Sequence, residues 1–398
     1  MDLTKLFKFM AEKRGSDLFF SAGAAVHIKI EGTLQPVNAQ PLDAETVKRA
    51  AYGLMNEQQV RQFESTMEMN FAISVADAGR FRVNVFRQRG SVAMVVRYIN
   101  DKIPSLETLG LPPVLAELAL EKRGLVLLVG STGSGKSTTL AAMMDQRNAN
   151  NSGHILSIED PIEFVHQHKK SIVNQREVGI DTASYANGLV NALREAPDVL
   201  MIGEIRDMET MRQALIYTQT GHLCLATLHA NNAYHAMNRV VNFFPQDERD
   251  NLLMDLALTL KGAISQRLVK GVDGKRVAAV EVMLNTMYVS DLIRKGDIGK
   301  IKEAIDQSLE AGSQSFEQSL LQLYQAGRIS RDEALQNADS RTDLAWLMSN
   351  ATQGQATGPT TPVHQLDMSE EAPVTDELAG FTLSPEQLGK LARNPLKR

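Results

Sequence analysis

The sequence predicts an α/β fold in which a mostly parallel sheet forms the core. Three observations carry this prediction. Between residues about 112 and 284, short apolar runs alternate with helical segments, as strands and helices do in βαβ units. These runs are Leu125–Val129, Ile155–Ile158, Val199–Ile202 and Leu223–Ala226. Residues 1–100 mix strand and helix patterns without that rhythm, and residues 285–349 show only the helical spacing of apolar residues.

Residues 1–100 are predicted to form one domain, an antiparallel sheet with helices packed on it. A first helix is predicted by apolar residues at helical spacing, namely Leu3, Leu6, Phe7 and Met10. Val26–Ile30 alternates as a strand does, and a second helix is expected over Ala44–Phe63. A hairpin is predicted further on, because alternating residues around Val83 are followed by a turn at Gln88–Ser91 and a returning strand over Val92–Val96.

The remaining domain boundaries follow changes in composition. Asp101–Leu111 contains Pro104 and Gly110 and is predicted to be a linker. The α/β domain then covers residues 112–284, and a C-terminal helical part covers 285–349. Residues 350–398 have little to bury and are rich in acids, so they are predicted to form a disordered acidic tail. Its last part, Phe381–Arg398, is either a short docking helix or a frayed terminus.

Composition excludes several classes of protein. The 398 residues are 43% apolar and 22% charged, which is ordinary globular usage, and the net charge of −5 opposes a global nucleic-acid binder. The single cysteine, Cys224, can form neither an internal disulfide nor a zinc site of several cysteines. No apolar run has the length of a membrane span or of a signal peptide, so we expect a cytoplasmic protein.

A phosphate-binding pattern, GxxxxGK[ST], follows the apolar run that ends at Val129. Its residues are Gly130, Ser131, Thr132, Gly133, Ser134, Gly135, Lys136, Ser137 and Thr138. The glycines let backbone N–H groups turn onto phosphates, and the helix that follows adds its positive end. Lys136 brings a cation to the β- and γ-phosphates, and the Ser137 hydroxyl is placed to bind Mg²⁺. The strand–loop–helix order disfavours a flexible Gly/Ser linker, so the sequence predicts a nucleotide site for ATP with Mg²⁺.

Two predicted strands end in acidic residues. Ile155–Ile158 is followed by Glu159, Asp160, Pro161, Ile162 and Glu163. Glu163 is a candidate general base or positioner for the attacking water. Val199–Ile202 is followed by Gly203 and Glu204, and Glu204 is the candidate that completes Mg²⁺ coordination together with Ser137. Gly203 stands where many such enzymes carry an aspartate, and Asp198 falls at the other end of that strand. The alternative for each acid, Glu159 and Asp160 above all, is a helix cap or a surface residue.

Two histidines flank the next strand, and they cannot share a metal ion. His222 precedes the strand and His229 follows it, and seven residues of extended chain span roughly 23 Å. His229 lies at the end where ligands bind in parallel sheets, so it is the candidate that contacts the γ-phosphate. A structural histidine is the alternative, for His222 more than for His229.

Five arginines lie between Arg80 and Arg97 with no acid among them, namely Arg80, Arg82, Arg87, Arg89 and Arg97. Such a cluster is either a solvated basic face, a nucleic-acid contact, or a set of arginine fingers that reach the nucleotide of a neighbouring subunit. The sequence assigns no individual role to Arg80, Arg87 or Arg89.

Together these motifs resemble the PilT/PilU family of type IV pilus retraction ATPases, in the secretion ATPase superfamily. The resemblance covers residues 1–349 and rests on Gly130–Thr138, Ile158–Glu163, Pro197–Asp198 with Leu200–Asp207, and Thr220–Ala230. It implies a PAS-like N-terminal domain, a RecA-like ATPase core and a hexameric ring. It also implies that Glu163 is the catalytic glutamate, that Glu204 is the Walker B acid, and that Arg82 and Arg97 cross between subunits.

The segment Val289–Lys295 stands where PilT-type members carry their retraction motif AIRNLIRE, and only Leu292, Ile293 and Arg294 are identical to it. This departure and the acidic extension resemble the accessory PilU branch more than the PilT branch. The implied function is ATP hydrolysis that drives or assists pilus retraction and twitching motility. The implied partners are further copies of the chain, a PilT-like paralogue and the inner-membrane platform protein of the pilus, with no nucleic acid. Two alternatives are an ATP-binding regulatory partner of a separate retraction ATPase and a nucleic-acid-translocating RecA-like motor.

Overall fold

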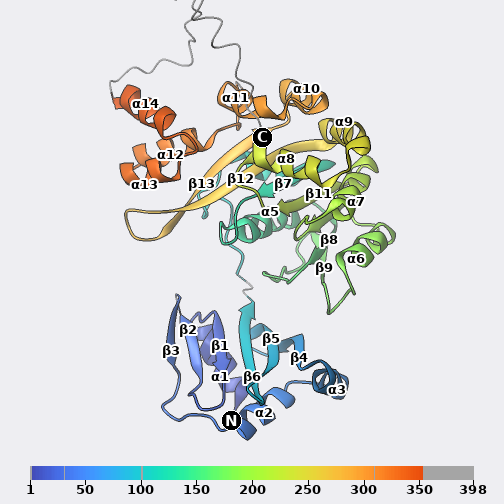
Figure 1. Cartoon of the computed structure of the whole chain (residues 1–398), viewed down its shortest axis with the longest axis vertical. Coiled ribbons are helices and arrows are strands. Elements are labelled where there is room, and N and C mark those ends of the chain that lie inside the picture. The colour runs from blue at the N-terminus through green and yellow to red at the C-terminus, as the bar shows by residue number, and fades with distance from the viewer. Residues whose placement is uncertain (1, 31, 100–101, 309, 353–398) are drawn as a thin grey trace, which may run out of the picture. The chain divides into compact units, whose positions relative to one another are not determined.

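The computed structural model describes residues 2–30, 32–99, 102–308 and 310–352, and these contain two β-sheets (Figure 1). The predicted disordered tail and its terminal helix lie outside the described residues from 353 onward. The last described helix continues to Thr352, three residues beyond the boundary that composition predicts at 349.

The first sheet has six strands in the order β3-β2-β1-β6-β5-β4. All its neighbours are antiparallel, as predicted. Its strands are β1 (Asp17–Phe20), β2 (His27–Ile30), β3 (Thr33–Pro36), β4 (Glu68–Val75), β5 (Gly79–Gln88) and β6 (Ser91–Ile99). Its helices are α1 (Leu3–Glu12), α2 (Ala44–Tyr52) and α3 (Glu57–Thr66). Aromatic and aliphatic side chains fill the space between them, and Phe7 of α1 stacks on Phe81 of β5 with ring centroids 4.8 Å apart.

The prediction of one helix over Ala44–Phe63 is wrong, because the segment forms α2 and α3 with a break between them. Asn56 begins α3 with a capping box, in which its side chain and that of Gln59 each accept from the other's backbone N–H. That exchange satisfies N–H groups that a continuous helix would have bonded to the preceding turn. The predicted hairpin is present as β5 and β6, and Arg89 and Gly90 turn with positive φ angles of 47° and 78°.

The second sheet has seven strands in the order β13-β12-β7-β11-β10-β8-β9. The five strands that come first along the chain are parallel to one another, namely β7 (Gly124–Val129), β8 (Gly153–Glu159), β9 (Ser171–Glu177), β10 (Val199–Ile202) and β11 (Leu223–Leu228). The long strand β12 (Leu260–Lys270) is parallel to β7, and β13 (Arg276–Leu284) returns antiparallel to it at the edge. This is the mostly parallel α/β sheet that the alternating apolar runs predict.

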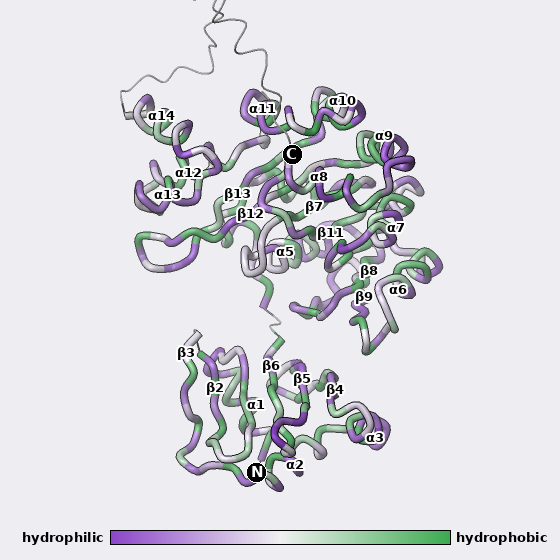
Figure 2. Tube along the Cα trace, viewed as in Figure 1, coloured by the Kyte–Doolittle hydropathy of each residue, from purple (hydrophilic) through white to green (hydrophobic). Residues whose placement is uncertain are grey.

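Helices cover both faces of this sheet, which explains why its central strands are apolar throughout. Along β7, Leu125, Leu127 and Val129 point to one face, whereas Val126 and Leu128 point to the other. The first face packs against α6 (Tyr185–Ala192), α7 (Met208–Gln219), α8 (Ala233–Phe243) and α9 (Arg249–Thr259). The second face packs against α4 (Val114–Leu120) and α5 (Lys136–Asn150). Figure 2 shows both hydrophobic (green) and hydrophilic (purple) stretches along α7 and α9, two of the helices that cover the first face.

The chain after β13 is helical, as predicted. Its helices are α10 (Met287–Lys295), α11 (Ile301–Asp306), α12 (Phe316–Gln325), α13 (Arg331–Asn337) and α14 (Arg341–Thr352). The first two join the core around α8 and α9. The last three pack on the far part of β12 and β13 in a separate apolar cluster that includes Val269, Phe316 and Leu344. We call α12–α14 the C-terminal helical module.

Candidate functional site

The predicted phosphate-binding loop joins the end of β7 to the start of α5. Gly133 and Gly135 have φ angles of 79° and 91°, a left-handed region that glycine adopts without strain. A Cβ at Gly135 would come within 2.6 Å of the Gln266 side chain, and one at Gly130 within 2.3 Å of Ser134 Oγ. The loop therefore needs glycine both for its backbone conformation and for its closeness to β12.

Lys136 begins α5 and is largely buried. Its ammonium donates to the carbonyl oxygens of Gly130 and Ser131, both at 2.8 Å, so the loop itself orients the side chain. Burial lowers the pKa of Lys136, and the negative charge of Glu204 opposes that shift. The cation is thus held in the loop close to an acid at the end of another strand.

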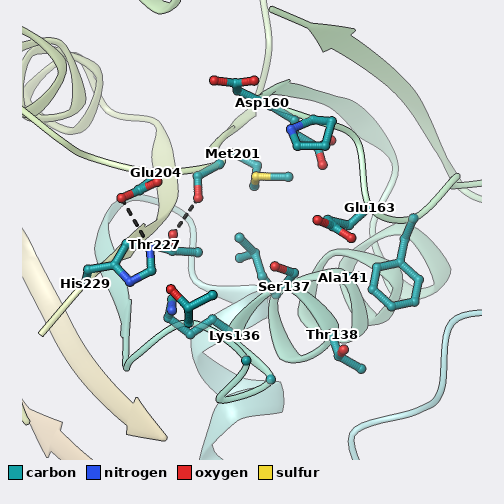
Figure 3. A pocket seen from close by; sticks show the side chains of 18 of the residues that line it. Lys136, Ser137, Thr138, Ala141, Asp160, Glu163, Met201, Glu204, Thr227 and His229 are labelled. Carbon is teal, nitrogen blue, oxygen red and sulfur yellow. Dashed lines mark hydrogen bonds and ion pairs between the residues drawn. The ribbon is translucent and has the colours of Figure 1, made fainter. Parts of the chain in front are cut away.

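A pocket opens beside this loop at the carboxyl ends of the parallel strands, the edge where such sheets bind ligands (Figure 3). The loop contributes Lys136, Ser137 and Thr138, and the segment after β8 contributes Asp160 and Glu163. The ends of the neighbouring strands β10 and β11 contribute Met201, Gly203, Glu204, Thr227 and His229. Residues that the motifs predict separately are therefore brought together in one pocket.

The acids after β8 differ in their surroundings. Glu159 is buried and accepts hydrogen bonds from Ser157 Oγ (2.6 Å) and Gln175 Nε2 (3.0 Å). Burial raises its pKa to about 7 in spite of those two bonds. Glu159 therefore ties β8 to β9, whereas Glu163 is exposed and its carboxylate points toward the middle of the pocket in Figure 3. A cis peptide bond joins Asp160 to Pro161 between the two glutamates.

The carboxylate of Glu204 is held from two sides. His229 Nε2 lies 3.3 Å from Oε1 of Glu204 (Figure 3), and Arg206 Nε donates to the other oxygen of Glu204 at 2.7 Å. Burial and then the charge of Lys136 lower the pKa of His229, whereas the charge of Glu204 opposes that shift. His229 thus bridges the end of β11 to the acid that follows β10.

Arg206 is a site residue that the motif reading did not single out. It donates to Glu204 and also to Asp160 Oδ2 (3.4 Å), and it thereby links the acids that follow β10 and β8. The available signal was its position two residues after Glu204, on the short segment between β10 and α7. Pocket-lining residues without a motif, such as Phe164, His166 and Tyr185, carried no such signal.

Gly203 has no room for the aspartate that many such enzymes carry there. A Cβ at this position would lie 2.8 Å from the Tyr185 hydroxyl and 3.2 Å from the Cα atom of Glu159. The Gly203 carbonyl also accepts a hydrogen bond from the Thr227 hydroxyl. Glycine therefore stands at position 203 in place of aspartate because the end of β10 passes close to Glu159.

Asp198 and His222 lie away from the pocket. Asp198 precedes β10, and its carboxylate accepts from the His154 backbone N–H at 2.8 Å. His222 precedes β11, contacts Thr220 Oγ1 at 3.0 Å and packs edge-on against the Tyr217 ring. Both are structural residues at the amino ends of their strands.

Arg82 and Arg97 are direct cross-strand neighbours on β5 and β6. Asp17 on β1 lies opposite Arg97 in turn, and Arg97 Nε donates to Asp17 Oδ1 at 2.8 Å. No ion pair holds Arg82 within the described part of its own domain. Two like charges directly opposite each other in a sheet are unfavourable, and the ion pair with Asp17 neutralises the charge of Arg97.

The described residues contain no cluster of three or more His, Cys, Asp or Glu side chains that could hold a metal ion by themselves. Among the same residues, no helix is both long enough and apolar enough to cross a bilayer.

Comparison with known proteins gives concordant matches over most of the chain. The family model described as type II/IV secretion system protein matches residues 2–336. The type IV pilus ATPase PilU of Pseudomonas aeruginosa is 52% identical over 357 residues, which cover 89% of this chain and 94% of that protein. The pilus retraction ATPase PilT of the same organism is 43% identical over 338 residues, with 85% and 98% covered. A crystal structure of the pilus retraction motor PilT with bound ADP superimposes with a TM-score of 0.81 and 39% identity, covering 87% of this chain and 99% of that one.

Proposed function

The chain belongs to the type II/IV secretion system family and, within it, to the PilT/PilU ATPases, and from this we propose how its site hydrolyses ATP to drive or assist type IV pilus retraction. One observation carries the proposal. The lysine of the phosphate loop, the exposed Glu163 and the Glu204–His229 pair surround a single pocket at the carboxyl edge of the parallel strands.

We assign the following roles to the pocket residues. The loop from Gly130 to Thr138 binds the phosphates, and Lys136 neutralises charge on the β- and γ-phosphates. Glu163 orients the attacking water and accepts its proton, since its exposed carboxylate points toward the middle of the pocket, whereas Asp160 accepts from Arg206. His229 contacts the γ-phosphate from its place beside Glu204.

Ser137 and Glu204 are the residues we propose to hold Mg²⁺. A hydroxyl and a carboxylate are hard oxygen donors of the kind that Mg²⁺ takes, and both line this pocket. Because the described residues supply no three-carboxylate or three-histidine cluster, the phosphates and water would complete the coordination. When bound, Mg²⁺ neutralises charge that develops on the phosphoryl oxygens.

We further propose that the active protein is a homohexamer in which Arg82 and Arg97 approach the nucleotide of the adjacent subunit. Arginine suits this role because its charge is permanent and its planar fork can take two phosphate oxygens. Arg82 is the stronger candidate, because Arg97 is already paired with Asp17. The ring would act with a PilT-like paralogue on the platform protein of the pilus, peripherally at the inner membrane from the cytoplasmic side. The predicted linker, Asp101–Leu111, would allow the domains to change angle during hydrolysis.

Two substitutions test the assignment of the pocket. Lys136→Ala should abolish ATP turnover and weaken nucleotide binding, whereas Glu163→Gln should keep binding and lose turnover. Lys122→Ala and Glu117→Gln are matched controls, because both side chains are exposed outside the pocket. Unchanged turnover in Lys136→Ala would remove the loop from the mechanism. Negligible turnover in the unaltered protein would instead favour a regulatory partner that binds ATP without hydrolysing it.

The accessory role is tested by a second measurement. ATPase activity of the purified chain is compared with and without the PilT-like paralogue, together with the native mass of each sample. A motor that acts alone shows the same rate per subunit in both. An accessory motor gains activity, and a mixed assembly, only with the paralogue.

A further inference from the structure

The loop that follows His229 is tied to residues more than thirty positions away. Asn231 and Asn232 come directly after the His229–Ala230 pair and before α8. The Asn231 carbonyl accepts from Arg267 Nη2 at 3.2 Å, and Asn232 Nδ2 donates to Asp339 Oδ2 at 2.9 Å. The position of this loop is therefore set by β12, which carries Arg267, and by the α13–α14 connection, which carries Asp339.

Arg267 and Asp339 form the centre of this arrangement. They are joined by a short ion pair, and their side chains are 23% and 18% exposed, so water screens the pair only in part. Arg267 also donates to the carbonyl of Asn337 at 2.7 Å and lies 3.9 Å from the ring centroid of the buried Phe316. The guanidinium is thus bound to the C-terminal helical module on three sides. We call Asn232, Arg267 and Asp339 the latch.

The residues next to the latch are held by further buried hydrogen bonds. The carboxylate of Glu281 on β13 is buried and accepts from the Ala233 backbone N–H (2.7 Å) and from Ser265 Oγ (2.9 Å). Ser340, next to Asp339, donates its backbone N–H to Glu317 at 2.7 Å. Both ends of the Asn232–Asp339 bond are therefore fixed to well-packed elements, and a shift at one end is transmitted to the other.

Strand β12 also connects the latch to the phosphate loop. Successive strand residues point to opposite faces, and Gln266, the neighbour of Arg267, accepts from Thr139 Oγ1 of α5 at 2.7 Å. One face of β12 thus contacts the helix that begins at Lys136, while the other holds the loop that carries His229.

We propose that Asp339 and Arg267 are positioning residues for ATP hydrolysis, through which the C-terminal helical module holds His229 at its contact with Glu204. The inference rests on the role of His229 proposed above. It assigns a catalytic consequence to a module that contributes no residue to the pocket beside the phosphate loop. It also predicts the reverse effect, in which a change at His229 reaches the module through Asn232 and Asp339.

A double-mutant cycle tests the proposal. Asp339→Ala should lower kcat about tenfold, because a small displacement of a group at the reacting phosphate is costly, and should leave KM for ATP within about twofold. In the His229→Ala background the same substitution should change kcat by less than about twofold, because the residue through which it acts is gone. Asp339→Asn keeps an oxygen that can accept from Asn232 and should restore part of kcat. It also replaces Asp339→Ala in the cycle if the alanine variant does not fold. Asp332→Ala, an exposed aspartate of the same module, is the control and should behave as the unaltered protein.

Three results would overturn the proposal: an unchanged kcat in Asp339→Ala, a loss expressed in KM alone, or a loss of equal size in both backgrounds. If His229→Ala alone leaves kcat unchanged, the route through His229 is wrong. The proposed ATPase function would survive that result, because it is tested separately by Lys136→Ala and Glu163→Gln.

Discussion

Single residues in this structure carry constraints that their type alone does not reveal. Gly203 is the clearest case, since its missing side chain leaves space that the Tyr185 hydroxyl and the backbone of Glu159 use. The φ angle of Gly203 is not positive, so its backbone conformation does not require glycine. The requirement for glycine comes from packing.

Gly203→Ala should therefore destabilise the protein by about 1–3 kcal/mol, the usual cost of an extra carbon in a packed site. Chemical denaturation measures the difference. Gly299→Ala is the control, because a Cβ there meets no atom within 4 Å. Adding Tyr185→Phe should recover part of the loss, since it removes the atom that would lie 2.8 Å away. Equal stability of the two alanine variants would show that the strand moves aside without cost.

Glu281 makes the stability of the protein depend on pH. Burial raises its pKa to about 7 from an ordinary value of 4.5, Asp339 adds to the shift, and Arg267 opposes it. The folded state therefore binds more protons than the unfolded state between those two values. The free energy of unfolding falls as the pH rises through this range, and the contribution of the protonated acid is lost above about pH 7.

Glu281→Gln mimics the protonated acid at every pH. Its stability relative to the unaltered protein should increase by roughly 1–3 kcal/mol between pH 5 and pH 8. Thermal or denaturant unfolding at several pH values measures this difference, with Glu117→Gln as an exposed control. A difference that does not vary with pH would mean that Glu281 ionises normally in the folded protein.

At the scale of elements, β12 is the strand on which the site depends most. It lies between β7 and β13, meets the phosphate-loop helix through Gln266, and meets the C-terminal helical module through Arg267. The bond between Thr139 and Gln266 joins two side chains that are almost fully buried. Loss of this bond leaves the side-chain oxygen of Gln266 buried without a donor, and the protein then bears the full desolvation free energy of that oxygen.

Thr139→Val should lower the free energy of unfolding by about 1–3 kcal/mol. It should also raise KM for ATP, because Gln266 packs against Gly135 in the loop. Denaturation and steady-state kinetics measure the two effects. Thr4→Val, on an exposed face of α1, is the control and should alter neither. A stability loss with unchanged KM would confine the role of this bond to the core.

The whole molecule is proposed to work as a ring, and mixed rings test that proposal. Lys136→Ala subunits lack the phosphate lysine but keep Arg82, and Arg82→Ala subunits have the opposite defect. Each variant alone should be slowed roughly 100-fold or more, since an arginine finger contributes at least that much. Mixed rings should recover activity, because some pockets then receive Arg82 from the neighbouring subunit. ATPase rates across mixing ratios measure the recovery.

The control for this experiment is a mixture of Lys136→Ala and Glu163→Gln. Both residues line the pocket of one subunit, so mixing cannot rebuild a complete site and no recovery is expected. Recovery in the control, or none in the test mixture, would contradict a role for Arg82 across the subunit boundary.

The sequence by itself determined the features that depend on local pattern. The phosphate loop, the strands Leu125–Val129 and Val199–Ile202, and the acids at the strand ends lie where spacing and motif predict them. A strand period and a loop motif are written within ten or so neighbouring residues, so they can be recognised without the fold. The same reasoning missed β3, whose four residues are all exposed and show no apolar alternation.

Only the tertiary structure decided which residues meet across long separations. Arg206 joins Asp160 to Glu204, Gly203 leaves room for Tyr185, and Asp339 reaches Asn232 across 107 positions. None of these contacts has a period or a motif, because each exists only when separate elements pack against one another. The roles of residues that lie between neighbouring strand ends, and of those on the face of β12 that contacts the C-terminal helical module, therefore follow from packing between separate elements.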